Sequence, residues 1–204
     1  MEFAPELTVT LKAGFSSNDK LAPSLFESLG YALVRHYWNM EIEMTEMPNA
    51  AVWADGISVR TFDPEHDNHR VWTAFTEAFQ DHWGMAPIPF DEWVAYEVSD
   101  LEPALCFLAM AGDEVAAFAL CNFHIGNGKV LWLGVRPAWR RLGLGMALLK
   151  HSFGEFYRRG TTKVELRVDA ENLTGATRLY ERAGMHITQQ FDIYSKVLRA
   201  GRAD

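Results

Sequence analysis

The sequence predicts an α+β fold in which a mixed, mostly antiparallel sheet is flanked by helices, and three stretches carry this prediction. Residues 130–157 have the pattern of a strand, a glycine-containing turn and a helix. Two apolar runs, 106–110 and 115–123, precede them with a short turn between, as in an antiparallel hairpin. Residues 162–168 follow as a strand, which a crossover helix would place parallel to the strand before it. Hairpins and one crossover together give a mixed sheet.

The N-terminal part of the chain has the pattern of strand, helix and strand. Alternating apolar and polar residues predict the strands, and the helix ends before Gly30, as a helix C-terminus prefers. The predicted elements here are a strand at 7–12, a helix at 18–29, a strand at 38–44, a linker at 48–56 and an edge strand at 57–62.

The predicted elements of the rest of the chain surround the stretch 130–157. Asp91 is the expected cap of the second helix. In order, these elements are a turn at 63–68, a helix with its apolar face at 71–79, a helix at 91–98, hairpin turns at 111–114 and 126–128, a helix at 174–183 ended by Gly184, and strands at 186–190 and 192–198.

The N-terminal segment resembles a later one. Residues 25–31 parallel residues 179–185, and Asn18 precedes the first copy by the same distance as Asn172 precedes the second. Residues 1–47 are therefore predicted to be a partial copy of the back half of the domain that follows, the alternative being a coincidental strand–helix–strand. The predicted organisation is a partial segment at 1–47, a linker at 48–56, a complete domain at 57–198 and a tail at 199–204.

Composition and charge exclude several classes of protein. The chain has 204 residues, of which 49% are hydrophobic, so a packed core is expected. The formal net charge of −8 argues against a nucleic acid or an anionic membrane as partner. Cys106 and Cys121 lie in apolar runs without metal-type spacing and are interpreted as reduced core thiols. No run reaches membrane length, so we expect a cytoplasmic protein.

The turn before the central helix has the features of a pyrophosphate site. The first N–H groups of a helix lack internal partners, and Gly143 and Gly145 let a ligand approach that backbone closely. Arg140 and Arg141 add positive charge to the helix dipole. A kinase-type P-loop would continue Gly-Lys-Ser/Thr, and a dinucleotide fingerprint would need a third glycine where Leu148 stands.

Two motifs instead resemble the GNAT acetyltransferase superfamily. The first is Arg140-x-x-Gly143-x-Gly145 after a strand ending Gly134-Val135. The second, within residues 168–185, resembles the segment Asn-x-x-Ala-x-x-x-Tyr-x-x-x-Gly-Phe of that family, with a methionine in place of the last aromatic. The resemblance covers residues 57–198 as a whole domain, and tandem GNAT proteins of the mycothiol synthase type are most similar. It implies the GNAT fold and acetyl-CoA as co-substrate, and no metal.

The resemblance also implies roles for individual residues. Tyr180 would be the general acid for the departing CoA sulfur, the alternative being a core aromatic. Asn172 would contact the pantetheine arm, or cap the next helix. Backbone groups of Leu133 and Val135 would pair with pantetheine along a splayed strand, where the thioester oxygen would also find an N–H donor. The expected cofactor-binding set is Leu133, Gly134, Val135, Arg140, Arg141, Leu142, Gly143, Leu144, Gly145, Met146, Asn172, Ala176 and Tyr180.

The sequence does not single out a general base. Mycothiol synthases resemble this chain but have a glutamate where Lys129 stands, which puts a mycothiol precursor as acceptor in doubt. Several polar residues could accept the proton of the amine, and each is also interpretable as a solvated group. They are Glu77, Asp81, His82, Glu92, Asn122 and His124. Asp63, His66, Asp67 and His69 are interpreted as a solvated turn rather than a metal cluster.

The sequence therefore predicts an N-acetyltransferase that moves an acetyl group from acetyl-CoA directly to a primary amine of a small molecule or peptide. The alternative is a non-catalytic CoA-binding or assembly module on the same scaffold. Residues 1–47 should pack against residues 57–198 or against a second chain, as in a homodimer, because an isolated half-sheet buries too little surface.

Overall fold

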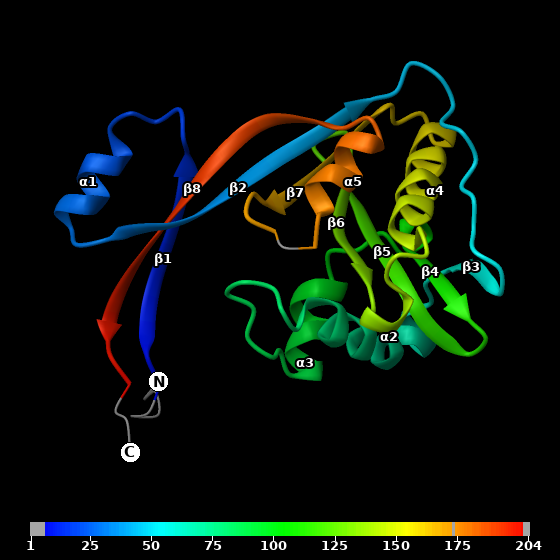
Figure 1. Cartoon of the computed structure of the whole chain (residues 1–204), viewed down its shortest axis with the longest axis horizontal. Coiled ribbons are helices and arrows are strands. Elements are labelled where there is room, and N and C mark those ends of the chain that lie inside the picture. The colour runs from blue at the N-terminus through cyan, green and yellow to red at the C-terminus, as the bar shows by residue number, and fades with distance from the viewer. Residues whose placement is uncertain (1–6, 173, 202–204) are drawn as a thin grey trace. The chain divides into compact units, whose positions relative to one another are not determined.

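The computed structural model describes residues 7–172 and 174–201, which form two compact units (Figure 1). The first unit contains the described residues of 1–40, 167–177 and 187–204, and the second contains residues 41–166 and 178–186. Strands are hydrogen-bonded in the order β1-β8-β2 in the first unit and β7-β6-β5-β4-β3 in the second. The described residues thus form a mixed sheet of eight strands with five helices, which confirms the predicted α+β fold.

The elements follow in the predicted order. Their bounds are β1 Val9–Ser16, α1 Ala22–Ser28, β2 Ala32–Glu43, β3 Ile57–Thr61, α2 Pro64–Phe79, α3 Phe90–Trp93, a π-helical turn Val94–Val98, a 3₁₀ turn Pro103–Leu105, β4 Phe107–Ala111, β5 Glu114–His124, β6 Asn127–Val135, a 3₁₀ turn Pro137–Trp139, α4 Leu144–Arg158, β7 Lys163–Asp169, α5 Ala176–Arg182 and β8 His186–Arg199.

In the second unit, β3 to β6 form an antiparallel meander and β6 pairs with β7 in parallel. Side chains alternate along β4, so Leu108 packs on the side of α2, while the ring of Phe107 lies 4.5 Å from that of His151 in α4. Helices α2 and α3 therefore cover one face of this sheet and α4 the other (Figure 1).

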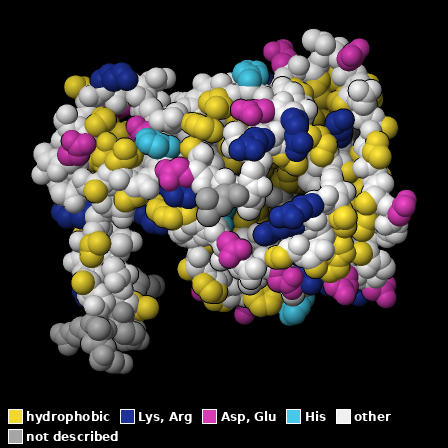
Figure 2. Space-filling view, viewed as in Figure 1, with side chains coloured by type: hydrophobic (Ala, Val, Ile, Leu, Met, Phe, Trp, Pro, Cys, Tyr) yellow, Lys and Arg dark blue, Asp and Glu magenta, His cyan; other side chains and the backbone are white. Residues whose placement is uncertain are grey.

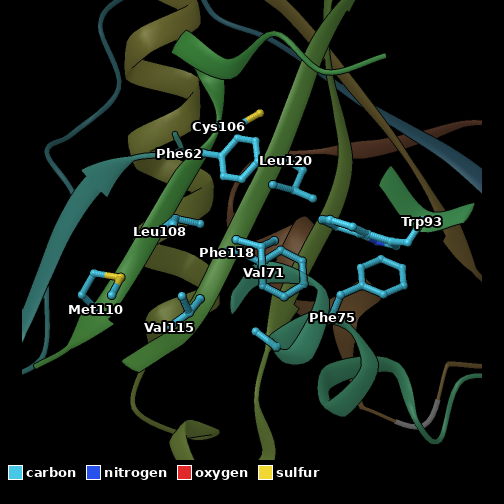
Figure 3. Packing of buried hydrophobic residues seen from close by; sticks show 11 residues of the cluster. Phe62, Val71, Phe75, Trp93, Cys106, Leu108, Met110, Val115, Phe118 and Leu120 are labelled. Atoms are coloured by element: carbon cyan, nitrogen blue, oxygen red, sulfur yellow. The ribbon is translucent and has the colours of Figure 1, made fainter. Parts of the chain in front are cut away.

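The core of the second unit lies between α2, α3 and the strands (Figure 3). Phe118, at the middle of β5, is fully buried and faces Phe75 of α2, with ring centroids 6.2 Å apart. Trp93, the last residue of α3, is also fully buried against Phe75. Because these rings fill the space between layers, the side chains of α2 and α3 cannot shift independently of β5.

The first unit has a small aromatic core. Strand β1 pairs with β8 in antiparallel register from Val9–Arg199 to Ser16–Phe191. The ring of Phe26 in α1 lies 5.1 Å from Phe15, which in turn stacks 5.1 Å from Tyr194 of β8. The prediction that the N-terminal strands pack on another part of the sheet is thereby confirmed for β1.

Several boundaries differ from the predictions for local reasons. The hairpin turn predicted at residues 126–128 lies earlier, at Ile125 and Gly126, which have φ values of 50° and 81°. The helix predicted to follow a turn at 63–68 begins at Pro64, because the carboxylate of Asp63 accepts the N–H of Glu65 and caps it.

Two further elements also differ. The residue at the N-cap of α3 is Pro89, and Asp91 lies in the first turn. The two C-terminal strands predicted are one continuous strand, β8. None of the described helices is both long and apolar enough to cross a membrane.

Candidate active site

Strand β6 has a free backbone edge at its C-terminal end. The described ladder with β7 pairs Gly128 with Val164 and ends where Val130 pairs with Leu166. Beyond that point β6 continues to Val135, paired with β5 on its other side. The described pairing of β6 with β7 therefore ends at Val130.

The hydrogen-bond pattern tells which groups line this free edge. The N–H of Arg136 donates to the carbonyl of Ala116 at 3.0 Å. Val135 and Ala117 are therefore a non-hydrogen-bonded pair, in which the N–H and C=O of Val135 point away from β5. Pairs alternate along an antiparallel ladder, and Leu133 has the same orientation as Val135. The N–H and C=O of Leu133 and the N–H of Val135 therefore lie on the edge away from β5, whereas the C=O of Val135 accepts a hydrogen bond from Arg140.

Gly134 lies between them and serves a packing role. A Cβ atom at this position would be 2.3 Å from Cζ of Phe118, so only glycine fits. The close approach of β6 to β5 at this point therefore depends on Gly134. One residue on β6, Leu131, is bulged, because Leu120 pairs with Trp132 while Cys121 pairs with Val130. The bulge lies directly after the last pair with β7.

The turn between β6 and α4 offers a cluster of unused amides. Arg141 and Gly143 have positive φ values, 68° and 78°, and Gly143 is the N-cap of α4. Within the described chain, no backbone N–H from residues 141–146 donates to a protein acceptor. No acidic side chain lies in the first turn of α4. Alternating backbone of this kind at a helix N-terminus forms a concave binding site for anions.

The side chain of Arg140 contacts two backbone carbonyls. Its Nε donates to the carbonyl of Val135 at 3.3 Å, and its Nη2 donates to the carbonyl of Ala78 at 3.1 Å. The guanidinium therefore joins the turn to β6 and to the end of α2. The neighbouring Arg141 is exposed and forms no ion pair with a described residue.

Lys and Arg side chains gather over α4 and α5, although the whole chain is acidic (Figure 2). Arg178 and Arg182, one turn apart on α5, are exposed and form no ion pair within residues 7–172 and 174–201. Lys150, on α4, is also without a carboxylate partner there. Unpaired cations on neighbouring helices favour an anionic ligand.

A pocket of about 330 Å³ lies beside the same turn. Residues 52–54 of the predicted linker form one wall, and Gly143, Met146 and Lys150 are part of the other. Of the remaining predicted residues here, Leu144 and Gly145 in the first turn of α4 are buried, and Leu142 in the preceding turn is half exposed.

Tyr180 lies in α5 and is 8% exposed. Burial raises the pKa of its phenol to about 12. The hydroxyl donates no hydrogen bond to any residue that the structure describes. It is therefore protonated at neutral pH and available to a ligand. Its neighbour Leu179 packs on α4, with Cδ1 3.3 Å from where a Cβ on Gly145 would lie.

Asn172 and Ala176 belong to the first unit. The amide oxygen of Asn172 accepts the N–H of Thr174 at 2.8 Å, so its side chain forms the turn that precedes α5. Ala176 is the first residue of α5. Leu173, between Asn172 and Thr174, lies outside the described residues.

Of the six polar residues considered as general bases, three form contacts with other groups of the chain and three are exposed. Glu77 pairs with Arg136 at 2.8 Å, and the Nδ1 atom of His82 lies 3.1 Å from the carbonyl of Trp83. The amide of Asn122 donates to the carbonyl of Asp100. Asp81, Glu92 and His124 are exposed.

One carboxylate that the sequence did not indicate contacts β6. Glu97, in the π-helical turn, accepts the indole N–H of Trp132 at 2.7 Å. Residues 97 and 132 are distant in sequence and neither belongs to a motif, so only the tertiary structure could reveal this pair.

Three of the polar residues at 63–69 are hydrogen-bonded to other side chains, His66 to Asp63 and Asp67 to Arg60. Among the described residues no group of His, Cys, Asp and Glu has a metal-binding arrangement. Asp67 is 2% exposed rather than solvated, and both its oxygens accept hydrogen bonds from Arg60, at 2.5 and 2.6 Å. Burial alone would raise the pKa of Asp67, but the bonds from Arg60 outweigh it and lower that pKa.

Comparison with known proteins adds an independent finding. A model described as "Acetyltransferase (GNAT) family" matches residues 68–185, more than half of the chain. A mycothiol acetyltransferase of Arthrobacter sp. (strain FB24) is 31% identical over 184 residues, which are 85% of this chain and 56% of that protein. One from Streptomyces scabiei (strain 87.22) is 30% identical over 94% of this chain and 62% of that protein.

Solved structures agree with this finding. A GCN5-related N-acetyltransferase from Sphaerobacter thermophilus has a TM-score of 0.84 and 37% identity, covering 98% of this chain and 63% of that one. A tandem GNAT protein from the clavulanic acid biosynthesis pathway has a TM-score of 0.70 at 13% identity, covering 96% of this chain and 65% of that one, and shares the fold. The chain thus spans 56% and 62% of the length of the two curated relatives.

Proposed function

The chain belongs to the acetyltransferase (GNAT) family, and from this premise we propose that it transfers an acetyl group from acetyl-CoA directly to a primary amine. The proposal rests on two backbone features that both belong to the second unit. Among the described residues, the amides of 141–146 at the start of α4 donate to no protein acceptor. The edge of β6 from Leu131 to Val135 has no pairing with β7 there, although the carbonyl of Val135 accepts a hydrogen bond from Arg140. Acetyl-CoA needs a site for its diphosphate and partners for its pantetheine amides.

We assign each part of the donor to one of these backbone features. The diphosphate would bind the amides of the turn, with Arg141 nearby, since charge-assisted bonds to backbone N–H groups are strong. The pantetheine arm would extend along β6 and bond Leu133 and Val135 in the manner of a strand. The thioester carbonyl would accept an N–H from the same edge, which stabilises the oxyanion formed on attack. Arg140 would hold the turn rather than the phosphates.

Tyr180 would act on the departing sulfur. Its phenol has a pKa of about 12, whereas a thiol has about 8.5, so complete proton transfer to a free thiolate would be uphill by about 5 kcal/mol. A hydrogen bond from the hydroxyl to sulfur costs no such transfer and stabilises the charge as it develops. We therefore assign Tyr180 the stabilisation of the thiolate, which solvent then protonates.

A thermal shift with acetyl-CoA tests the proposal. A ligand present at one hundred times its dissociation constant stabilises the folded state by about 2.7 kcal/mol, so Tm should rise by roughly 5–10 °C. S-acetyl-N-acetylcysteamine is the matched control, because it keeps the thioester and one amide but lacks the diphosphate. It should shift Tm far less at equal concentration. No rise with millimolar acetyl-CoA would refute the proposed function.

A CoA-binding module without turnover is the second candidate. It is favoured because none of these candidate bases is both buried and unpaired: Glu77 forms an ion pair, and Asp81, Glu92 and His124 are exposed. Release of CoA in the presence of small-molecule and peptide amines distinguishes the two. Amine-dependent release supports transfer, whereas a thermal shift without release supports the binding module.

A further inference from the structure

Trp132 of β6 forms a hydrogen bond with the carboxylate of Glu97. The two side chains lie on the face of the sheet that α2 and α3 cover. The indole N–H of Trp132 donates to Oε2 of Glu97 at 2.7 Å. No described cation pairs with Glu97, and no described residue donates to its other oxygen, Oε1. The carboxylate is therefore oriented by one bond and retains a free acceptor.

The orientation of Trp132 is fixed by its neighbours. Its ring meets Phe75 edge-on at 4.9 Å and Phe79 at 5.2 Å, both on α2. Packing against these two rings of one helix orients the indole and its N–H. Glu97 is held where that N–H points, so its position relative to β6 follows from packing rather than from a flexible side chain.

The backbone around Glu97 is irregular in a manner that often marks functional sites. Helix α3 ends at Trp93 and the chain continues as a π-helical turn over Val94–Val98. Such turns are uncommon and occur frequently at functional sites. Trp93, four residues before Glu97, is fully buried, and its Nε1 has no acceptor among the residues described.

We propose that Glu97 binds the ammonium group of the acceptor and takes its proton, so that the acceptor is a primary amine that arrives as a cation. This inference rests on the proposed function. Trp132 lies two residues before Gly134 on the strand whose edge would hold the acetyl thioester. Trp132 of β6 thus positions the carboxylate of Glu97. The carboxylate of Glu77, by contrast, is neutralised by its ion pair with Arg136.

The reaction balances without a further reactant. The ammonium gives one proton to the carboxylate of Glu97 and becomes a nucleophile, whose lone pair forms a bond to the acetyl carbon. The C–S bond then breaks, its electron pair stays on sulfur, and the hydroxyl of Tyr180 stabilises the thiolate. The new amide nitrogen loses a second proton to solvent, and the thiolate gains one from solvent. Glu97 returns its proton to solvent, so the net release is one proton.

The test compares amines that differ in charge at about pH 7.5. n-Butylamine and ethanolamine are ammonium ions there, and hydroxylamine is neutral. Glu97→Gln keeps an oxygen for the N–H of Trp132 but neither attracts a cation nor accepts a proton. We expect it to lower kcat/KM about 10²–10⁴-fold for the two ammonium substrates, and less than about tenfold for hydroxylamine. The acetyl-CoA thermal shift should be unchanged.

Two further variants control this comparison. Trp132→Phe keeps the ring but removes the N–H, so it should lower kcat/KM for the ammonium substrates by a smaller factor. Asp91→Asn removes an exposed carboxylate in α3 and should have no effect. Equal losses with charged and neutral amines, or no loss in Glu97→Gln, would overturn the inference while leaving the proposed function intact. If the wild-type protein shows no acetyl-CoA shift or no amine-dependent CoA release, the proposed function fails and this inference fails with it.

Discussion

Replacing Gly134 by alanine tests the packing on which the position of β6 depends. The new methyl group would lie 2.3 Å from Cζ of Phe118, whereas ordinary contacts begin at 3.4 Å, so the ring must move by about 1.1 Å. Phe118 is fully buried between Phe75 and Phe79, with ring centroids at 6.2 and 6.4 Å, and has little room to move. Overpacking of this size costs about 1–3 kcal/mol.

The net effect is somewhat smaller, because alanine is favoured over glycine in a strand by about 0.5–1 kcal/mol. We expect Gly134→Ala to lower the free energy of unfolding by about 1–2 kcal/mol, and Tm by roughly 2–8 °C. Urea denaturation followed by tryptophan fluorescence gives the first value and a thermal scan the second.

A second substitution and a matched control make the test specific. Phe118→Leu removes the ring atoms that clash, so Gly134→Ala in that background should be neutral or slightly stabilising, with a coupling of about 1 kcal/mol or more. Gly154→Ala in α4 places its methyl 3.7 Å from Arg158 and should stabilise by up to about 1 kcal/mol. Additive effects of the Gly134 and Phe118 changes, or a neutral Gly134→Ala, would refute the packing argument.

Three further predictions concern other residues. Tyr180→Phe should lower kcat about 10–10³-fold with little change in the acetyl-CoA thermal shift, and an unchanged kcat would make Tyr180 a core residue only. Asp67→Asn should destabilise at pH 7 by about 3 kcal/mol, because it leaves Arg60 without its buried partner. The pKa of Asp67 is lower in the folded state than its ordinary value. The difference in stability between wild type and Asp67→Asn should therefore be present above the ordinary pKa and vanish as the pH falls through the folded pKa. Urea midpoints that differ by the same amount at every pH would contradict this. Burial raises the pKa of Cys106 to about 12 and that of Cys121 well above its ordinary value, so both thiols should resist iodoacetamide until urea unfolds the chain, and rapid labelling of native protein would argue against it.

Much of the fold could be predicted because its signals are local. A Cβ-free residue is needed where φ is positive, so Gly184 marked the end of α5. The errors arose where local signals compete. The glycines at 126 and 128 both suit a turn, but a Cβ at Gly128 would lie 2.6 Å from Phe156, so that glycine is required by packing and the turn lies earlier.

The sequence by itself indicated the order of the elements, the glycine turn at the start of α4 and the family, since all three depend on residues that are close along the chain. Only the tertiary structure decided that Arg140 binds the carbonyls of Val135 and Ala78 rather than standing free, and that Trp132 holds Glu97. The physical reason is the range of the interactions. A helix N-terminus leaves its amides unpaired wherever it forms, whereas the partner of a guanidinium or an indole is set by which distant elements pack beside it.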